Sequence, residues 1–271
     1  MAIKPKVFKQ MTKLIAGSMS AGRYAVRLAR SESEIHAAQN LRYEVLFKES
    51  GGRITREMLN TEREEDEWDQ VAYHVVVIDT RNEDKVVGTV RLVSNRALES
   101  DQPFYTEHAF DLSGLRKKYQ RMLELSRACV SPDGRGGAIL MLIWKFTMQF
   151  IEQNKYDVLF GCASFKGVDH QKHIEILSYL YEHHLASKEL MPSPKQDVKS
   201  VAINDFLQPS GKGKDRGKVP TMLRGCLKIG ARISEHAIID PVFNTTFVAI
   251  YVDAREMFGT NHLLVNRSIE H

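Results

Sequence analysis

Apolar and polar residues alternate along the chain in two rhythms, which predict a succession of strands and helices. Stretches with a period of two, or with short runs of β-branched residues, predict strands. They lie at residues 24–28, 73–78, 86–93, 122–130, 156–163, 231–239 and 246–252. Stretches with a helical period predict helices at 4–19, 31–45, 55–65, 138–151 and 168–185. This order predicts an α/β domain whose mixed central sheet has helices on both faces.

Two local signals support these boundaries. Ser31 followed by Glu34 matches a capping box, in which both side chains satisfy backbone amides at a helix start. A polar turn at 81–84 lies between two strand-like stretches and predicts a β-hairpin.

The composition is that of an ordinary globular protein, since 43% of the 271 residues are hydrophobic and 27% are charged. The longest strictly apolar run, 138–144, is too short to cross a bilayer. The three cysteines lack CxxC spacing, which argues against a disulfide framework or a structural zinc site. The N-terminus has no continuous apolar stretch of the kind found in secretory signals. We therefore expect a cytoplasmic protein.

Basic residues gather in two places, although the net charge is only +4. Residues 1–22 form a basic N-terminal segment, whose amphipathic helix either packs on the domain or lies on the inner face of an anionic cytoplasmic membrane. A second basic stretch overlaps an irregular insertion at about 188–220, inside a domain that spans 23–271. Nucleic acid is not expected as a partner, because aromatic residues are not interleaved with the basic ones.

A glycine-rich loop follows the strand at 122–130. Gly134, Gly136 and Gly137 allow close approach to the backbone, and a helix begins near Ala138. Free amides and the dipole at a helix start favour a phosphate group. The loop is neither a Walker motif nor a GxGxxG fingerprint, so a purely structural turn is the alternative.

Charged residues interrupt several apolar stretches. Arg91, Glu124 and Arg127 lie in predicted strands, where a charge on a covered face needs a partner. Further charges lie nearby in the predicted order of elements: Arg42, Asp66 and Asp69. These residues either pair with one another in a structural network or form a site that binds a charged substrate.

Residues 130–138, here called the donor loop, resemble the acyl-donor loop of GNAT acyltransferases. The matching positions are Val130-Ser131-Pro132 and Arg135-Gly136, followed by a helix. Two later glycine positions of that family are occupied by Ala138 and Leu140. The resemblance therefore implies a smaller phosphate cradle, suited to the phosphopantetheine of acyl carrier protein. Its donor-binding residues would be Val130, Arg135, Gly136, Gly137 and Ala138.

The charged set resembles that of acyl-homoserine lactone synthases and of the related ornithine acyl-ACP N-acyltransferases. Three stretches are more similar to the ornithine enzymes: ELSRACV at 124–130, GCASF at 161–165 and LRGCLKIGA at 223–231. The resemblance covers about residues 24–252. It implies a GNAT-like single α/β domain that transfers a (3-hydroxy)fatty acyl group from acyl carrier protein to the amine of ornithine or a similar amino acid, giving a lyso-ornithine-type aminolipid.

Amide formation from a thioester needs a base, because an amine is almost fully protonated at neutral pH. We expect Glu124 to be this base, and we group Asp69 with it as catalytic. Asp66 and Asp69 would face the ammonium groups of the acceptor. Its carboxylate would be bound by guanidinium groups from the set Arg42, Arg91 and Arg127.

Strict alternation would place Glu124 and Arg127 on opposite faces of the sheet. The GNAT resemblance implies a β-bulge here, which would bring them together and free the backbone amide of Cys129 or Val130 as an oxyanion donor.

Other interpretations remain open at this point. Cys129 or Cys162 would carry the acyl group in a ping-pong reaction. A lactone synthase would use S-adenosylmethionine as its acceptor, and a non-enzymatic basic domain would bind nucleic acid or membranes. The histidines at 170, 173, 183 and 184 lack a matching carboxylate pair, so neither a metal nor any other cofactor is expected. For the acidic acyl carrier protein, the candidate contacts are Arg135, Lys145 and the lysines at 212–218.

Overall fold

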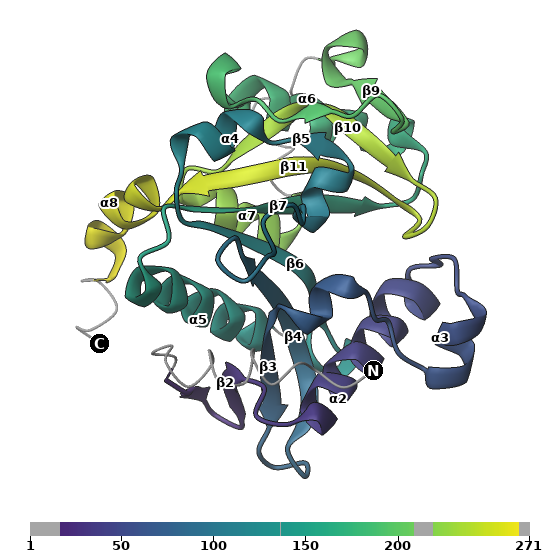
Figure 1. Ribbon diagram of the computed structural model, residues 1–271, viewed down its shortest axis with the longest axis vertical. Coiled ribbons are helices and arrows are strands. Elements are labelled where there is room, and N and C mark those ends of the chain that lie inside the picture. The colour runs from purple at the N-terminus through teal and green to yellow at the C-terminus, as the bar shows by residue number, and fades with distance from the viewer. Residues whose placement is uncertain (1–16, 136, 209–218, 266–271) are drawn as a thin grey trace. The chain divides into compact units, whose positions relative to one another are not determined.

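The computed structural model describes residues 17–135, 137–208 and 219–265, and these fall into two compact units (Figure 1). The first unit contains the chain up to Phe104 together with Leu123–Lys155. The second contains Tyr105–Met122 and the chain from Tyr156 onward. Each unit is an antiparallel sheet covered by helices, so the predicted α/β character is present in both.

The first unit has a five-stranded sheet in the order β1-β2-β3-β4-β6. Its strands are β1 (Met19–Ala21), β2 (Tyr24–Leu28), β3 (Tyr73–Asp79), β4 (Lys85–Ser94) and β6 (Met122–Val130). Its helices are α2 (Glu32–Arg42), the π-helix η1 (Tyr43–Glu49), α3 (Arg56–Thr61), the 3₁₀ turns η2 (Glu67–Gln70) and η4 (Pro132–Gly134), and α5 (Ala138–Asn154).

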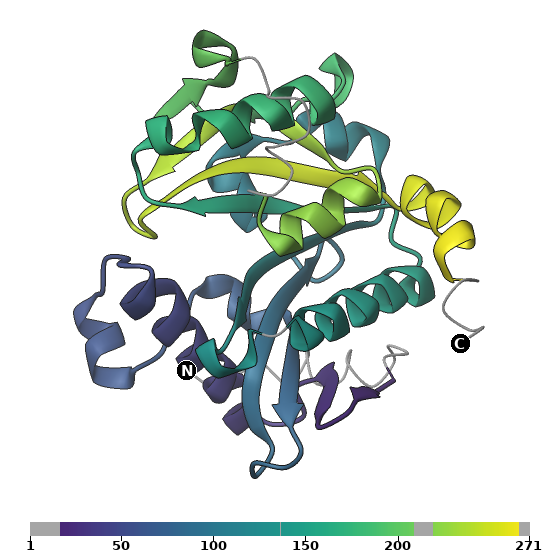
Figure 2. The ribbon, with the colours of Figure 1, turned by 180° about the vertical axis from the view of Figure 1, so that it is seen from behind.

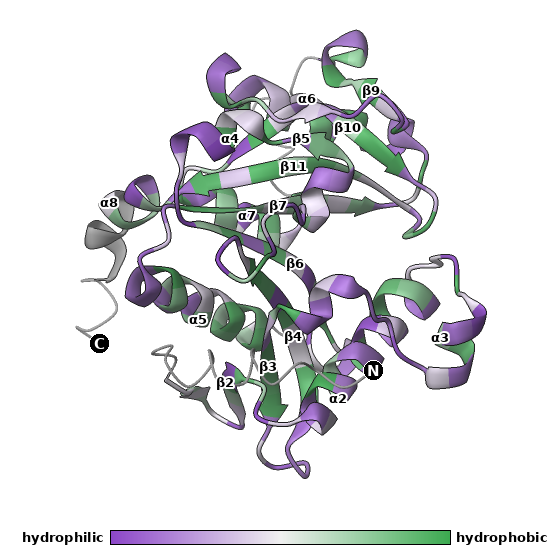
Figure 3. Cartoon of the chain, in the orientation of Figure 1, coloured by the Kyte–Doolittle hydropathy of each residue, from purple (hydrophilic) through white to green (hydrophobic). Residues whose placement is uncertain are grey.

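Two helices cover opposite faces of this sheet. The aromatic rings of Tyr73 and Phe150 lie 5.4 Å apart, which places α5 on the face formed by odd-numbered residues of β3. On the other face, Val76 packs in one apolar cluster with Ile35 and Ala38 of α2. Figure 3 shows that β3 and β4 are hydrophobic along most of their length, as expected for strands covered on both sides.

The second unit has a four-stranded sheet in the order β7-β11-β10-β9. Its strands are β7 (Val158–Lys166), β9 (Ser200–Ala202), β10 (Arg232–Asp240) and β11 (Thr245–Asp253), with a separate pair β5 (Phe110–Asp111) and β8 (Ser193–Pro194). Its helices are α4 (Ser113–Lys118), α6 (Ile174–His184), α7 (Thr221–Lys228) and α8 (Ala254–Val265), with the 3₁₀ turns η3 (Tyr105–His108), η5 (His170–His173), η6 (Lys188–Leu190) and η7 (Ile203–Phe206).

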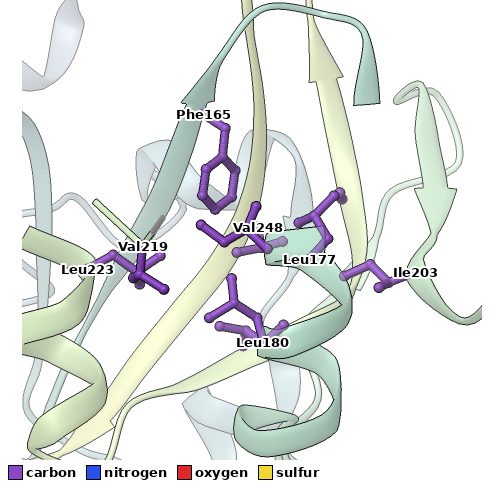
Figure 4. Close-up of a cluster of buried hydrophobic side chains, with 10 residues drawn as sticks. Phe165, Leu177, Leu180, Ile203, Val219, Leu223 and Val248 are labelled. Atoms are coloured by element: carbon purple, nitrogen blue, oxygen red, sulfur yellow. The ribbon is translucent and has the colours of Figure 1, made fainter. Parts of the chain in front are cut away.

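Helices α6 and α7 lie on the same face of the second sheet, as Figure 2 shows. The core between them joins Leu177 and Leu180 of α6, Leu223 of α7, and Val248 of β11 (Figure 4). Ile203 also belongs to this core and is completely buried. The predicted irregular insertion at about 188–220 therefore contributes an edge strand and a core residue, while its residues 209–218 lie outside the described part.

Most predicted boundaries agree with the structure, and three need correction. Residues 4–16 of the predicted N-terminal helix lie outside the described residues, and Met19 belongs to strand β1. Helix α3 ends at Thr61, because Glu62 adopts the left-handed conformation at its C-terminus. Helix α6 begins only at Ile174, after a 3₁₀ turn that Asp169 caps.

Candidate active site

A network of buried charges lies on the face of the first sheet that α2 covers. Its members, here called the charged cluster, are Arg42, Glu64, Asp66, Asp69, Arg91 and Arg127. Three guanidinium groups thus face three carboxylates, so the formal charges of the cluster cancel. A buried network of this kind is tolerated only where nearly every charge has a partner of opposite sign.

Arg42 is the last residue of α2, and its side chain is 1% exposed. It donates to both carboxylate oxygens of Asp69, over 2.8 and 2.6 Å, and its Nε lies 2.5 Å from the Glu64 carboxylate. The apolar stripe of α2 directs this residue inward, because Ile35, Ala38 and Leu41 pack against the sheet. The helix pattern therefore determines where Arg42 lies.

The loop that carries the three carboxylates is held by its own backbone. Asp66 accepts a hydrogen bond from the amide of Trp68 over 3.0 Å, and Asp69 accepts one from the amide of Asp66 over 3.1 Å. These reciprocal bonds form a capping box around η2. The Trp68 indole donates to the carbonyl of Pro103 over 2.9 Å and fixes the other side of the turn.

Two strand arginines complete the cluster. Arg91 of β4 pairs with Asp66 and lies 3.2 Å from Asp69, and it donates to the hydroxyl of Ser126 over 3.1 Å. Arg127 of β6 donates to Glu64 over 2.8 Å and to Asp66 over 2.9 Å. The strand arginines are thus paired, as the structural alternative expected, but their partners are the carboxylates of the loop.

The predicted β-bulge is confirmed in β6. The register moves from Thr89 opposite Cys129 to Arg91 opposite Ser126, so one strand holds an extra residue. Arg127 lies at this point with a φ of 54°, a left-handed conformation that costs a non-glycine residue about 1 kcal/mol or more. The bulge brings the side chain of Arg127 to Glu64 and to Asp66, and Asp66 is also a partner of Arg91.

The end of β6 also shows which backbone amides are directed toward β4 and which are directed away from it. The amide of Ser131 donates to the carbonyl of Val87 over 2.9 Å. Because hydrogen-bonding directions alternate along an antiparallel strand, the amide of Val130 points away from β4 and that of Cys129 points toward it. Of the two candidate oxyanion donors, the amide of Val130 is therefore the one directed away from β4.

Burial and ion pairing shift the pKa values of the buried acids in opposite directions. Burial by itself raises the pKa of Asp69, but the guanidinium groups of Arg42 and Arg91 outweigh it and hold the pKa below its usual range. Glu64 behaves alike, since Arg127 and Arg42 outweigh burial and lower its pKa. Burial lowers the pKa of His74, whose ring contacts the Asp69 carbonyl over 2.9 Å. The two paired carboxylates therefore stay ionised at neutral pH and are poor proton acceptors.

Glu124 lies completely buried in β6, opposite Val93. Ser126 is two residues further along the strand, so both side chains point to the face that holds the charged cluster. The structure thus places the predicted base on the same side of the sheet as the arginines.

Glu64 was not predicted from the sequence, although it links Arg42 to Arg127 at the centre of the cluster. The loop sequence carries no signal that singles it out from the neighbouring acids. Asp69 is only 5% exposed and is enclosed by two arginines and a backbone amide. Its role in catalysis or acceptor binding stays a prediction, whereas the side chain of Asp66 keeps 17% of its surface exposed.

The donor loop leads into α5 through a tight turn. Gly137 has a φ of 88° immediately before the helix, a conformation that favours glycine. Gly134 is buried against the side chain of Ile139, which leaves no room for a larger residue. Gly136 lies outside the described residues. Ala138 begins the helix, so the first amides of α5 have no partner within the helix.

The described residues give little support to a cysteine nucleophile. Burial raises the pKa of the Cys129 thiol to about 12, so the thiolate is scarce at neutral pH. The Cys162 sulfur lies 3.6 Å from the hydroxyl of Thr106. Within the described ranges, no group of three or more His, Cys, Asp or Glu side chains could hold a metal ion.

The fold and the site define an acyltransferase of the GNAT class. Residues 41–145 match the family model described as an acetyltransferase (GNAT) domain. The GNAT-type α/β fold predicted from the donor loop is therefore confirmed. The interpretation as a non-enzymatic basic domain was wrong.

The comparison with individual proteins is more specific. The chain is 35% identical to the L-ornithine N(alpha)-acyltransferase of Rhodobacter capsulatus, over 91% of this chain and 96% of that protein. It is 32% identical to the enzyme of the same name from Agrobacterium fabrum, over 88% of this chain and 83% of that protein. The chain belongs to the L-ornithine N(alpha)-acyltransferase family, as its resemblance predicted. Among the described residues, no helix has the length and apolarity needed to span a bilayer.

Proposed function

We propose that this enzyme transfers a (3-hydroxy)fatty acyl group from acyl carrier protein to the α-amine of L-ornithine, forming a lyso-ornithine-type aminolipid. The observation that carries the acceptor assignment is the family membership, because the relatives are named for ornithine Nα-acylation. A lactone synthase acting on S-adenosylmethionine has no comparable support.

The cluster offers a binding group for the acceptor carboxylate. The Nη2 atom of Arg91 is buried and has no hydrogen-bond partner among the described residues. A buried guanidinium donor without an acceptor is costly, and a carboxylate would satisfy it strongly. Asp66 keeps part of its surface exposed and would face the side-chain ammonium of ornithine. Arg42 and Asp69 would act as positioning residues that hold Arg91 and Asp66 in place.

The chemistry requires one proton to leave the α-ammonium before attack. In this proposal Glu124 accepts that proton, directly or through water. The amine nitrogen then forms a bond to the thioester carbonyl carbon, and the negative charge that develops on the oxygen is stabilised by the amide of Val130. When the carbon–sulfur bond breaks, the thiolate of the carrier takes up the proton held by Glu124, and the second proton that the nitrogen loses on becoming an amide passes to solvent. No cofactor is needed for this balance.

The donor loop would hold the phosphopantetheine phosphate. Its single phosphate fits a loop in which Ala138 and Leu140 replace the glycines of acetyl-CoA users. On α5, the side chain of Met141 is 56% exposed. Lys145 is also exposed and lies one helical turn after Met141 on the same side, and Arg135 precedes the helix. A basic surface with an apolar centre would suit an acidic carrier protein. The lysines at 212–218 lie outside the described residues.

The proposed location is the cytoplasm, with contact to the inner face of the membrane through residues 1–22. The product supports this assignment, because an acylated amino acid with a free carboxylate would partition to a lipid surface.

The test is to mix the purified enzyme with 3-hydroxyacyl-ACP and a panel of amino acids, with 3-hydroxyacyl-CoA as a parallel donor. Mass spectrometry then identifies the products. We expect Nα-acylornithine from the carrier-bound donor. Transfer to another amine would refute ornithine as the acceptor. Equal use of both donors would refute the role of the carrier protein.

A further inference from the structure

Arg135 of the donor loop is paired with a residue from a distant part of the chain. Its guanidinium group lies 2.5 Å from the carboxylate of Glu49, the last residue of η1. We propose that Glu49 selects the acyl donor, by disfavouring a free coenzyme A thioester relative to the single phosphodiester of a carrier-bound phosphopantetheine. This inference rests on the proposed function and extends it to a residue outside the charged cluster.

Glu49 is held in place by the helix that it ends. Phe47 is 1% exposed and anchors η1 in the first unit. The amides of Gly51 and Gly52 donate to the carbonyl of Phe47 over 2.9 and 3.0 Å, and the hydroxyl of Ser50 donates to the carbonyl of Val45. These bonds close the π-helix directly after Glu49. The position of its carboxylate beside the donor loop is thus built into the backbone.

The ion pair remains accessible to a ligand. The side chain of Arg135 is 49% exposed and that of Glu49 is 41% exposed. An exposed pair of this kind contributes little to stability, so a phosphate can compete for Arg135 at small cost. A functional role explains the pair better than a stabilising one.

The charges around the donor loop limit how many negative charges a bound anion can carry. Arg135 is paired with Glu49 of η1, and Asp133 is exposed two residues earlier in η4, so these three residues together carry one negative charge in excess. A phosphodiester brings one negative charge and can replace the Glu49 carboxylate on Arg135. Coenzyme A brings a pyrophosphate and a ribose phosphate, and these additional charges are repelled by Glu49 and Asp133. The phosphopantetheine of a carrier-bound donor lacks those additional phosphates beside the single phosphodiester.

The measurement is kcat/KM for 3-hydroxyacyl-CoA divided by kcat/KM for 3-hydroxyacyl-ACP, with ornithine as acceptor. Glu49→Gln should raise this ratio about fivefold, which corresponds to about 1 kcal/mol. Glu44→Gln is the matched control, because Glu44 lies on the same π-helix and pairs with Lys48 over 2.7 Å instead. The control should leave the ratio unchanged. Added salt should raise the ratio of the wild type more than that of Glu49→Gln, since salt screens exposed charges.

The comparison of donors and the comparison of variants distinguish a failure of the proposed donor from a failure of the role of Glu49. If the wild type uses both donors equally, the proposed donor itself is wrong. If the wild type prefers the carrier and Glu49→Gln matches Glu44→Gln, only the selecting role of Glu49 is wrong. Circular dichroism checks the fold of each variant, and Glu49→Lys supplies a second test, in which the ratio should rise further than in Glu49→Gln.

Discussion

Replacing Glu64 by glutamine tests whether the charged cluster is one interlocked unit. The carboxylate is 2% exposed and is shared between Arg42, at 2.5 Å, and Arg127, at 2.8 Å. Glutamine keeps the shape and one acceptor oxygen but leaves three guanidinium groups facing two carboxylates. Removing one partner from a buried ion pair costs about 3–5 kcal/mol. Because the amide oxygen still accepts a hydrogen bond, we expect Glu64→Gln to lower the free energy of unfolding by about 3 kcal/mol.

The assay is urea denaturation followed by circular dichroism, at pH 7 and with an unchanged m-value. Glu65→Gln is the control, since Glu65 is next in the chain, is 46% exposed and lies 4.0 Å from Arg63. It should change the free energy of unfolding by less than about 0.5 kcal/mol. Equal losses in the two variants would show that Glu64 is not an essential partner of the buried arginines.

The pH dependence of stability gives an independent check on the same residue. The folded protein lowers the pKa of Glu64, so its ion pairs stabilise the fold fully above the unfolded pKa of about 4.3. That contribution is lost as the pH falls below this value toward the folded pKa. The difference in free energy of unfolding between wild type and Glu64→Gln should therefore shrink between about pH 5 and pH 3.

Three further variants test the proposed chemistry, all by rates of ornithine acylation from the carrier-bound donor. Glu124→Gln should keep its circular dichroism spectrum and lose at least about 100-fold in kcat, the usual value of a general base; a full rate would remove Glu124 from that role. Arg91→Lys should raise KM for ornithine more than it lowers kcat, because lysine lacks the planar fork that directs Nη2 to a ligand while the other two nitrogens contact Asp66 and Ser126. Cys129→Ala should retain kcat within about threefold, whereas loss of all transfer in a folded variant would restore the ping-pong mechanism.

The regular elements could be predicted because their side chains follow a strict period. Strand β6 begins and ends at the predicted residues, since Met122 and Leu123 are buried and the donor loop follows Val130. Helices α4, α7 and α8 were not predicted. Helices α4 and α7 have six and eight residues, which is too short for a helical period to be distinguished from a loop. Helix α8 has twelve residues and follows the last element predicted from the sequence.

The site was predictable in its residue types but not in its pairing. A charge in an apolar strand indicates that it needs a partner, which is why Arg91 and Arg127 could be singled out. Nothing in a loop sequence distinguishes a buried acid such as Glu64 from an exposed one such as Glu65. That distinction depends on the turn at η2, where the capping box between Asp66 and Asp69 orients the loop toward the sheet.

One backbone irregularity connects the two halves of the site. Without the extra residue at Arg127, strand alternation would direct this arginine to the face that α5 covers, into the apolar packing of Tyr73 and Phe150. Burial of an unpaired guanidinium there would be far more costly than the left-handed φ of 54° that the bulge imposes. The same irregularity directly precedes Cys129 and Val130, where the strand enters the donor loop. The conformation that completes the ion pairs thus lies next to the amide proposed to meet the thioester, so the proposed acceptor and donor sites share one strand.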